Sequence, residues 1–330
     1  MKIFVTGCAG FIGYHLCFKL LQQGHSIIGI DNFSTYYNPN LKGARSCKLE
    51  TEFPDTYKLY IKDISDFSEI EKIFNKEHPD KVVNLAAQAG VRHSVKDPFS
   101  YVNTNLVGFF NILHLSMKEK CSLIYASSSS VYGRNISPWK EDMRVNCPSS
   151  FYGATKICNE VLAESYVENF KMNITGLRFF TVYGPWGRPD MAMFLWAEAI
   201  NEGKPITLYN NGDMNRSFTF IDDIVEPIVT LINKTNTQPG HKIYNLGNCS
   251  SINIEEVADL IGKCIGKKVI KEYHPEIIMG DVKTTHANIE LAKKDLGFFP
   301  KVSIYEGIPI FVEWFLKYVE NINKNKGEII

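Results

Sequence analysis

The stretch KIFVTGCAGFIG, residues 2–13, decides the fold of this chain. Its first five residues are mostly apolar and β-branched, which is typical of a buried strand. The strand runs into a G-x-x-G-x-x-G turn, after which apolar side chains recur at helical spacing. Glycines at these positions allow a tight turn, a close approach of the backbone to a pyrophosphate and close packing of the helix on the strand. The order of strand, glycine turn and helix therefore predicts a dinucleotide-binding unit.

A carboxylate follows the next apolar run. Residues 26–30 predict a second strand, which ends at Asp31, 18 residues after Gly13. A carboxylate there accepts hydrogen bonds from a ribose diol and repels a 2′-phosphate, so NAD is favoured over NADP. We expect the dinucleotide to contact Gly7, Gly10, Phe11, Ile12, Gly13, Asp31 and Asn32.

Strands and helices alternate along the first 180 residues. Strands are predicted near 2–6, 26–30, 57–61, 81–85, 121–127 and 173–179. This alternation predicts a Rossmann-type α/β fold, a doubly wound parallel sheet with helices on both faces. Ligands bind beyond the carboxyl ends of such strands, so further cofactor contacts are expected from Asp63, Ile64, Leu85, Ala86 and Ala87. Residues 33–56 look irregular, and we expect them to run over the surface.

The alternation weakens beyond about residue 180, where Pro, Gly and Asn become more frequent. We therefore expect residues 1–180 to form the NAD-binding domain. Residues 181–330 should form mainly a smaller C-terminal α/β domain that binds substrate, and a segment near 215–245 should return to the first domain.

Composition limits the classes of partner. The chain has 330 residues, with 36 Lys and Arg against 36 Asp and Glu, and eight cysteines without a C-x-x-C pair. Zero net charge favours neither nucleic acid nor an anionic membrane as a partner. No apolar run approaches the length of a transmembrane helix, and the histidines show no metal-ligand spacing. We expect a soluble cytoplasmic protein with no metal, no nucleic acid and no membrane partner.

A serine run and a Tyr–Lys pair supply the candidate chemistry. Residues 127–130 are all serine and follow the fifth predicted strand, and Tyr152 precedes Lys156 by four residues. This spacing places the phenol and the ammonium on one helix face. A nearby positive charge favours the phenolate, which can take a proton from an alcohol while its carbon loses a hydride. Because chance also produces this spacing, the pair gains its meaning from the dinucleotide-binding turn.

Together these elements resemble the extended short-chain dehydrogenase/reductase superfamily, and within it the nucleotide-sugar 4-epimerases, most closely the UDP-glucuronate 4-epimerases. The resemblance runs to about residue 320 and rests on residues 6–13, Asp63, Leu85-Ala86-Ala87, Asn105, Ser128 to Gly133 and Tyr152 to Lys156. It implies a retained NAD, a UDP-sugar substrate, a place in polysaccharide biosynthesis, and a homodimer through helices near 100–117 and 152–169.

The resemblance also implies a role for each residue of the site. Tyr152 takes the proton of the sugar 4-hydroxyl as C4 delivers its hydride to the nicotinamide. Lys156 lowers the pKa of the tyrosine and binds the nicotinamide ribose, Ser128 hydrogen-bonds the 4-oxygen, and Asn105 belongs to the cofactor site. The 4-keto sugar then turns over in the pocket and receives the hydride on its other face.

The residues beside Ser128 bear on the substrate. Sugar dehydratases of the superfamily place Asp-Glu after the catalytic threonine, and UDP-glucuronate decarboxylases place a Glu directly before Val-Tyr-Gly. Here these positions are Ser129 and Ser130, which disfavours dehydration and, less firmly, decarboxylation, because a 4-keto-uronate loses CO₂ without a dedicated base. We expect the carboxylate of a uronate to be held by the hydroxyls of residues 128–130, by Thr181 and by Arg188. The alternative for Arg188 is a structural ion pair at a helix start.

Further substrate contacts are expected from Arg92 and from the second half of the chain. Arg92 resembles a substrate-facing element, Tyr209 is suited to stack on a base, Arg216 to meet phosphates, and Asp281 to meet a sugar hydroxyl. Each has a structural alternative: a core position for Tyr209, an ion pair for Arg216 and a turn cap for Asp281. Relatives usually have Gln or Arg and Pro where residues 277–279 read Ile-Ile-Met, so no contact is carried over to that segment.

Other functions remain open on the sequence alone. The nearer ones are a 4-epimerase of UDP-glucose or UDP-N-acetylglucosamine, which would not depend on Arg188, and a UDP-glucuronate decarboxylase. A more distant one is a non-catalytic NAD-binding regulator, since a fold does not imply an activity. Such regulators commonly lack the Tyr–Lys pair.

Overall fold

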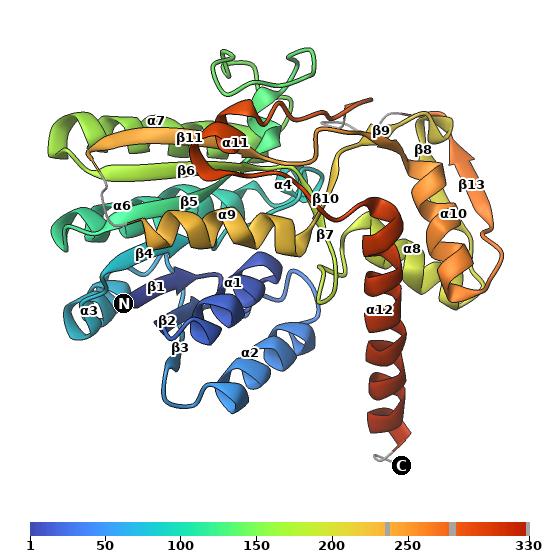
Figure 1. Cartoon of the computed structure of the whole chain (residues 1–330), viewed down its shortest axis with the longest axis horizontal. Coiled ribbons are helices and arrows are strands. Elements are labelled where there is room, and N and C mark those ends of the chain that lie inside the picture. The colour runs from blue at the N-terminus through green and yellow to red at the C-terminus, as the bar shows by residue number, and fades with distance from the viewer. Residues whose placement is uncertain (235–237, 277–281, 328–330) are drawn as a thin grey trace.

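The computed structural model describes residues 1–234, 238–276 and 282–327, and a seven-stranded parallel sheet forms its centre (Figure 1). The strands are β1 Lys2–Thr6, β2 Ser26–Asp31, β3 Tyr57–Ile61, β4 Lys81–Asn84, β5 Ser122–Ser128, β6 Asn173–Phe179 and β11 Gly240–Leu246. They lie in the order β11-β6-β5-β4-β1-β2-β3. The direction of winding changes between β1 and β4, and the carboxyl ends of these two strands are level, with Thr6 opposite Asn84. A ligand crevice is expected beyond them.

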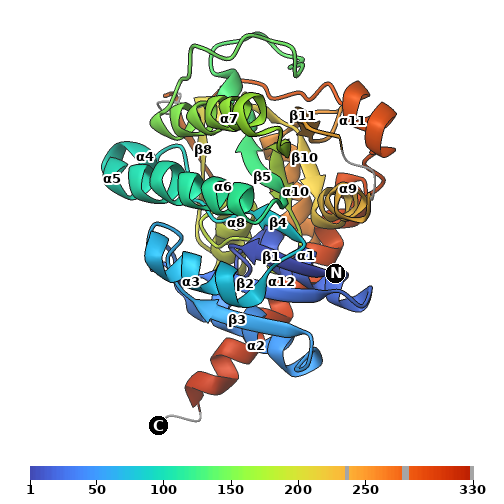
Figure 2. The same cartoon turned by 90° about the vertical axis from the view of Figure 1, so that its left-hand side faces the viewer.

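Helices cover both faces of this sheet. The helical elements are α1 Phe11–Gln22, α2 Asn40–Glu52, α3 Phe67–Glu77, α4 His93–Lys96, α5 Pro98–Tyr101, η1 Val102–Gly108 (a π-helix), α6 Phe109–Lys118, η2 Ser129–Tyr132, α7 Phe151–Phe170, α8 Ala192–Asn201, η3 Asn210–Gly212, α9 Ile221–Asn233, α10 Ile254–Ile265, α11 Glu290–Leu296 and α12 Ile304–Gly327. Figure 2 shows α3, α6 and α7 on one side of the sheet and α1 and α9 on the other.

Alternation along each central strand explains the two covered faces. In β1, Phe4 belongs to the apolar cluster of α3, α6 and α7, whereas Ile3 and Val5 belong to the cluster that includes α1 and α9. Successive side chains of a strand point to opposite faces, so a strand that is buried on both sides is apolar throughout.

A smaller unit lies beyond the carboxyl ends of the strands, at the right of Figure 1. Its strands form three two-stranded pairs: β7 Thr181–Tyr183 with β10 Phe218–Phe220, β8 Ile206–Tyr209 with β13 Lys271–His274, and β9 Asn215–Arg216 with β12 Ile252–Asn253. Helices α8 and α10 pack beside them, and the first half of α12 packs against α10 and the core. The chain between β10 and β11 returns to the large sheet, because β11 pairs with β6 and α9 packs on α1.

The predicted fold class is confirmed, and the six predicted strands agree with β1 to β6 within one residue at each end. The prediction for residues 33–56 was wrong. Residues 40–52 form α2, which buries Leu41, Lys42, Arg45 and Leu49. Two of these side chains are cationic, so the buried face of α2 does not show the apolar spacing by which an amphipathic helix is recognised.

Candidate active site

The glycine turn between β1 and α1 forms one wall of the site. Gly7 has a φ of +69°, and a Cβ built on it would lie 2.8 Å from the backbone nitrogen of Ala86. A Cβ at Gly13 would lie 2.0 Å from the carbonyl oxygen of Gly7, so the start of α1 packs too closely for any side chain. The first N–H groups of a helix have no acceptor within it. This helix terminus therefore suits the phosphates of a dinucleotide.

A cavity of about 270 Å³ opens beside the turn. The predicted site residues that line it are Gly7, Gly10, Phe11, Ile12, Gly13, Asp31, Asn32, Ile64, Leu85, Ala86, Ala87, Ser128, Tyr152, Lys156 and Arg188. The cavity thus joins the carboxyl ends of β1, β2, β4 and β5 to the first turns of α7, which is where a doubly wound sheet places its ligand.

Asp31 ends β2 with a carboxylate that the backbone holds in place. Its Oδ2 accepts a hydrogen bond from the N–H of Ala9 at 3.2 Å, and its Oδ1 accepts one from the N–H of Phe33 at 2.9 Å. The ammonium of Lys42 lies 3.9 Å from Oδ1, and both side chains are more than nine-tenths buried. Burial lowers the pKa of Lys42, and Asp31 offsets part of that effect. A fixed carboxylate in this wall suits ribose hydroxyls and opposes a 2′-phosphate.

The end of β5 and the start of α7 bring together the predicted Ser, Tyr and Lys. Ser128 Oγ accepts a hydrogen bond from the N–H of Ser130 at 3.1 Å and so caps η2. The ammonium of Lys156 donates to the carbonyl of Ala126 at 2.9 Å. The hydroxyl of Tyr152 interacts with Ser128. All three side chains therefore face one cavity from two neighbouring elements.

The ionisation of this set reflects its burial. Burial raises the pKa of the Tyr152 hydroxyl, while the hydrogen bond with Ser128 and the charge of Arg188 offset part of the rise. Burial lowers the pKa of Lys156 to about 8, although the charge of Glu160 acts in the opposite direction. The sequence predicted that Lys156 would lower the pKa of Tyr152. In the structure the ammonium of Lys156 donates to a carbonyl and lies 5.9 Å from the centroid of the tyrosine ring, and this role of Lys156 stays a prediction.

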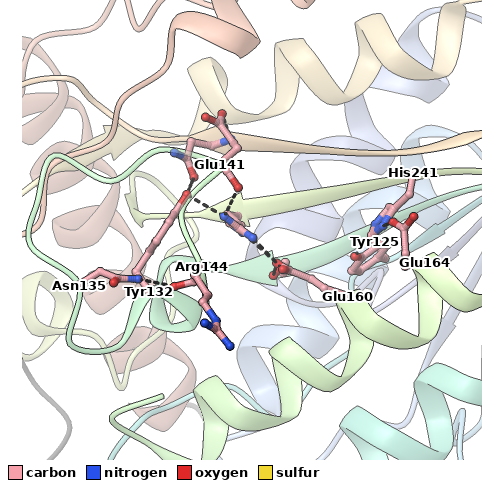
Figure 3. Close-up of polar contacts among 11 residues, drawn as sticks. Tyr125, Tyr132, Asn135, Glu141, Arg144, Glu160, Glu164 and His241 are labelled. Carbon is pink, nitrogen blue, oxygen red and sulfur yellow. Dashed lines mark hydrogen bonds and ion pairs between the residues drawn. The ribbon is translucent and has the colours of Figure 1, made fainter. Parts of the chain in front are cut away.

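A buried polar network ties β5, α7 and β6 together behind this wall (Figure 3). The carboxylate of Glu160 accepts hydrogen bonds from Ser127 Oγ at 2.6 Å and from Nε and Nη2 of Arg178 at 2.9 and 2.8 Å. Arg178 also donates to the hydroxyl of Tyr132 at 3.0 Å and to the carbonyl of Glu141 at 3.2 Å. The serine strand is thereby fixed against the helix that carries the tyrosine and the lysine.

Residues 184–190, between β7 and α8, bring a guanidinium to the cavity. Arg188 donates from Nε and Nη2 to the two carboxylate oxygens of Asp190, at 3.0 and 2.5 Å, and from Nη2 to the carbonyl of Ala89 at 3.1 Å. These bonds engage Nε and Nη2, and the hydroxyl of Tyr36 is a further hydrogen-bond partner of the side chain. Thr181 lines a neighbouring cavity of about 40 Å³, and Arg188 belongs to the walls of both cavities.

Four predicted residues lie behind the walls of the main cavity. Asp63 accepts a hydrogen bond from the amide of Asn32 at 2.7 Å. Asn105, in the π-helix, bonds both the N–H and the carbonyl of Gln88. Ser129 and Ser130 form the start of η2, directly after Ser128. These contacts position residues that line the cavity.

Two predicted substrate residues meet outside the cavity. The guanidinium of Arg92 lies 4.9 Å from the centroid of the Tyr209 ring. Tyr209 is partly exposed and packs against the edge of the hydrophobic core. Arg216 donates from Nη1 to two backbone carbonyls, at 2.9 and 3.1 Å. Asp281 and residues 277–279 lie outside the described residues.

Sequence reasoning missed several residues that shape the site. Tyr36, Lys42 and Gln88 line the cavity. Ser94, which is fully buried, accepts the N–H of Tyr152 at 3.2 Å and so holds the first turn of α7. Only Glu160 carried a signal, because it follows Lys156 by four residues and therefore shares its helix face.

The described part of the chain contains no group of three or more His, Cys, Asp or Glu side chains placed to hold a metal ion. Over the same residues, no helix combines the length and the apolar character needed to cross a membrane.

Comparisons with known proteins agree with this geometry. Residues 3–247 match the model of the NAD dependent epimerase/dehydratase family. The chain is 44% identical to Protein CapI of Staphylococcus aureus, over 96% of this chain and 99% of that protein. It is 39% identical to UDP-glucuronate 4-epimerase 5 of Arabidopsis thaliana, over 99% of this chain and 78% of the plant protein. A crystal structure of the UDP-glucuronic acid 4-epimerase of Bacillus cereus, in complex with UDP-glucuronic acid and NAD, is similar with a TM-score of 0.90 at 34% identity, covering 96% of this chain and all of the other.

Proposed function

Because the chain belongs to the NAD dependent epimerase/dehydratase family, we propose that it interconverts UDP-glucuronate and UDP-galacturonate by inverting C4 of the sugar through a transient 4-keto intermediate. The observation that carries the proposal is the single cavity in which Ser128, Tyr152 and Lys156 face a glycine-turn wall, with Arg188 at its edge. Relatives that match almost the whole chain bear the name UDP-glucuronate 4-epimerase.

The residues of the cavity fit NAD. Gly7, Gly10 and Gly13 leave space where a side chain would collide with the backbone, and the start of α1 offers N–H groups to a diphosphate. Asp31 offers a carboxylate to a ribose, and Lys156 lies where it can bind the other ribose. When bound there, NAD would supply the acceptor and the donor of the hydride that C4 of the sugar exchanges.

Two residues in the cavity wall formed by β5 and α7, Tyr152 and Ser128, carry out the proton transfer. Tyr152 accepts the proton of the sugar 4-hydroxyl and returns it when the ketone is reduced, with Ser128 hydrogen-bonded to the same oxygen. Burial opposes ionisation of the phenol, so the tyrosine depends on the groups that stabilise its anion. In this site these are Ser128 and the positive charges of Arg188 and Lys156.

Recognition of a uronate depends on Arg188. Its Nη1 is not used by Asp190 among the described residues, and a guanidinium binds a carboxylate more specifically than an ammonium does. Thr181 and the hydroxyls of residues 128–130 complete the predicted carboxylate site. Holding the carboxylate also keeps its bond to C5 away from the orientation in which a 4-keto-uronate loses CO₂.

We also propose a homodimer formed by the helices near 100–117 and 152–169. Apolar side chains on α5, η1, α6 and α7 are exposed in the single chain, among them Phe99, Val107, Phe110 and Val161. Replacing Val161, which is 64% exposed, by Glu would place a charge in this face and should yield a monomer in light scattering coupled to gel filtration. An unchanged mass would exclude Val161 from the interface.

The proposal also covers the domain organisation of the protein and its cellular location. Its division into an NAD-binding domain, residues 1–180 with a return near 215–245, and a UDP-sugar domain is supported by the pairing of β11 with β6. The cytoplasmic location accords with eight free cysteines, because disulfides are rare in reducing compartments.

To test the activity, the purified protein is incubated in parallel with UDP-glucuronate, UDP-glucose and UDP-N-acetylglucosamine. No NAD is added, and the products are identified by proton NMR. We expect UDP-glucuronate to reach an equilibrium with its 4-epimer and the neutral sugars to remain unchanged. Turnover of the neutral sugars alone would overturn the uronate assignment, and accumulation of a UDP-pentose would identify a decarboxylase.

A further inference from the structure

Arg45 connects two parts of the site that lie far apart in the sequence. The side chain projects from α2 and has no exposed surface. Its Nη1 donates to the carbonyl of Ala9, in the glycine turn, at 2.8 Å and to the hydroxyl of Tyr37 at 3.1 Å. Its Nη2 donates to the carbonyls of Trp186 and Gly187. One guanidinium therefore bridges the cofactor wall and the loop that carries Arg188.

The guanidinium of Arg45 forms no hydrogen bond to an acid among the described residues, and the charge of Asp31 offsets only part of the effect of its burial. Among the described residues its hydrogen-bond acceptors are carbonyls and one hydroxyl, and its Nε has no hydrogen-bond partner. Burial of a charge without a counter-ion opposes folding, and an unpaired N–H adds to that cost. Stability alone would favour an apolar side chain at this position, so the bonds to the loop indicate another role.

The loop that Arg45 holds has a backbone conformation that requires support. Trp186 has a φ of +60°, a region that bulky side chains rarely adopt. Its ring packs against Tyr14 and Trp314, with centroid distances of 5.4 and 5.6 Å. His15, on α1, contacts the carbonyl of Pro185 through Nε2 at 2.9 Å. A carbonyl only accepts, so Nε2 carries the proton. The carbonyls of residues 185, 186 and 187 are thus all held by side chains of α1 and α2.

Arg188 follows directly after these three carbonyls. The next residue along a chain lies only about 3.8 Å away, so the position of the 185–187 backbone determines where the guanidinium of Arg188 enters the cavity. We propose that Arg45 is a positioning residue that holds this loop against the glycine turn and thereby sets the contact of Arg188 with the carboxylate of the sugar. The proposal rests on the proposed function, because it assigns Arg188 to a uronate.

The test is a comparison of two ligands that differ in this carboxylate. Binding of UDP-glucuronate and UDP-glucose is measured by calorimetry on NAD-loaded protein that carries Tyr152→Phe, so that neither sugar turns over. Arg45→Lys keeps the charge but has one compact donor group, which cannot bond the turn and both loop carbonyls together. We expect the dissociation constant of UDP-glucuronate to rise about tenfold and that of UDP-glucose to change less than about twofold.

A double-mutant cycle decides whether Arg45 acts through Arg188. In an Arg188→Ala background, Arg45→Lys should cause no further loss of UDP-glucuronate binding, because coupled residues are not additive. Losses that add, or equal weakening of both ligands, would overturn the positioning role. Glu50→Gln, at an exposed position of the same helix, should leave both affinities unchanged.

A second variant covers the case in which Arg45→Lys does not fold. His15→Phe keeps the ring and removes only the donor to Pro185, so it should weaken UDP-glucuronate selectively, by about threefold. Equal weakening of both ligands in this variant would also overturn the proposal. The premise is tested separately: if Arg188→Ala alone leaves the preference for UDP-glucuronate unchanged, the uronate role of Arg188 fails. If Arg188→Ala is selective while Arg45→Lys and His15→Phe are not, only the positioning role fails.

Discussion

Arg178 and Arg45 are both buried, with 2% and 0% of their surface exposed, but they have different neighbours. Arg178, on β6, bonds both carboxylate oxygens of Glu160, on α7, inside the large sheet. Arg45, on α2, bonds backbone carbonyls and one hydroxyl at the junction of that sheet with the loop before α8. The first region therefore contains a charge that is bonded directly to a carboxylate, and the second a charge that is bonded only to neutral groups.

This difference predicts how substitutions in each region should affect stability and ligand binding. Removing one partner of a buried ion pair leaves the other charge without compensation, which strongly destabilises the fold. The loss of Arg45 leaves uncharged backbone carbonyls without one donor, which costs less than an unpaired buried charge. We therefore expect changes near Arg178 to reduce stability or chemistry, and changes near Arg45 to alter ligand selectivity in a protein that still folds.

The largest expected effect is on the chemistry that the Arg178 region supports. Tyr152→Phe removes the proton acceptor, and kcat for UDP-glucuronate should fall by about 10²- to 10⁴-fold. The NAD content of the purified variant should stay unchanged. Tyr166→Phe, on the same helix, is the control and should keep its activity. Full activity in Tyr152→Phe would show that another group accepts the proton.

The next prediction concerns the buried ion pair between Glu160 and Arg178. Glu160→Gln leaves Arg178 buried without its counter-ion, so the free energy of unfolding should fall by about 3–5 kcal/mol. Urea unfolding measures it. The matched control is Glu168→Gln on the same helix, whose side chain is 72% exposed and 4.0 Å from Lys171; it should cost about 0–1 kcal/mol. Equal costs for the two variants would remove the distinction between the buried and the exposed pair.

A pH dependence follows from Lys156, which lies beside the same network. Burial lowers its pKa to about 8 from a usual value of 10.5, so between these values the unfolded chain binds more protons than the folded one. Stability contributed by this group therefore rises with pH across that window. Lys156→Met should be more stable than the natural protein at pH 7.5. This advantage should shrink by about 2 kcal/mol by pH 9.5, as measured by urea unfolding at both pH values. A difference that stays constant with pH would show that Lys156 is not buried as a charge.

The smallest expected effect concerns the choice between NAD and NADP at Asp31, whose charge acts on Arg45. Asp31→Asn keeps the hydrogen-bond acceptor near Ala9 but removes the charge that opposes a 2′-phosphate. After incubation with equal excess NAD and NADP, the ratio of NAD to NADP released from the protein should fall about tenfold. Chromatography of the released nucleotides measures this ratio. Asp55→Asn, at an exposed position, is the control, and an unchanged ratio in Asp31→Asn would assign the discrimination to another residue.

The sequence was most informative where a function depends on neighbouring residues. The glycine turn, Asp31 and the Tyr152–Lys156 spacing are local patterns, and the structure places all of these residues at one cavity. The prediction for residues 33–56 failed for the opposite reason. The buried face of α2 includes Lys42 and Arg45, and the acceptors of Arg45 at residues 186 and 187 lie about 140 positions away. No periodicity within the helix can reveal such a partner.

Side chains in loops and at the ends of elements show the same limit. Arg92 and Tyr209 were each expected to contact substrate, yet their mutual contact came only from the structure. Arg188 was expected to meet a carboxylate, and the first carboxylate it meets is that of Asp190. Side chains in loops are placed by tertiary packing rather than by a repeating backbone geometry, so their partners are not encoded in local spacing.

The sequence by itself determined six strands of the parallel sheet, the NAD-binding turn and the identity of the Ser, Tyr and Lys that line the cavity, because strand alternation, glycine conformation and helix periodicity act over a few residues. Only the tertiary structure decided which charges act on Tyr152, which acid holds Arg178 and which carbonyls hold Arg45. Electrostatic and hydrogen-bond energies depend on distances in space, and in this chain those distances join residues that are 18 to 142 positions apart.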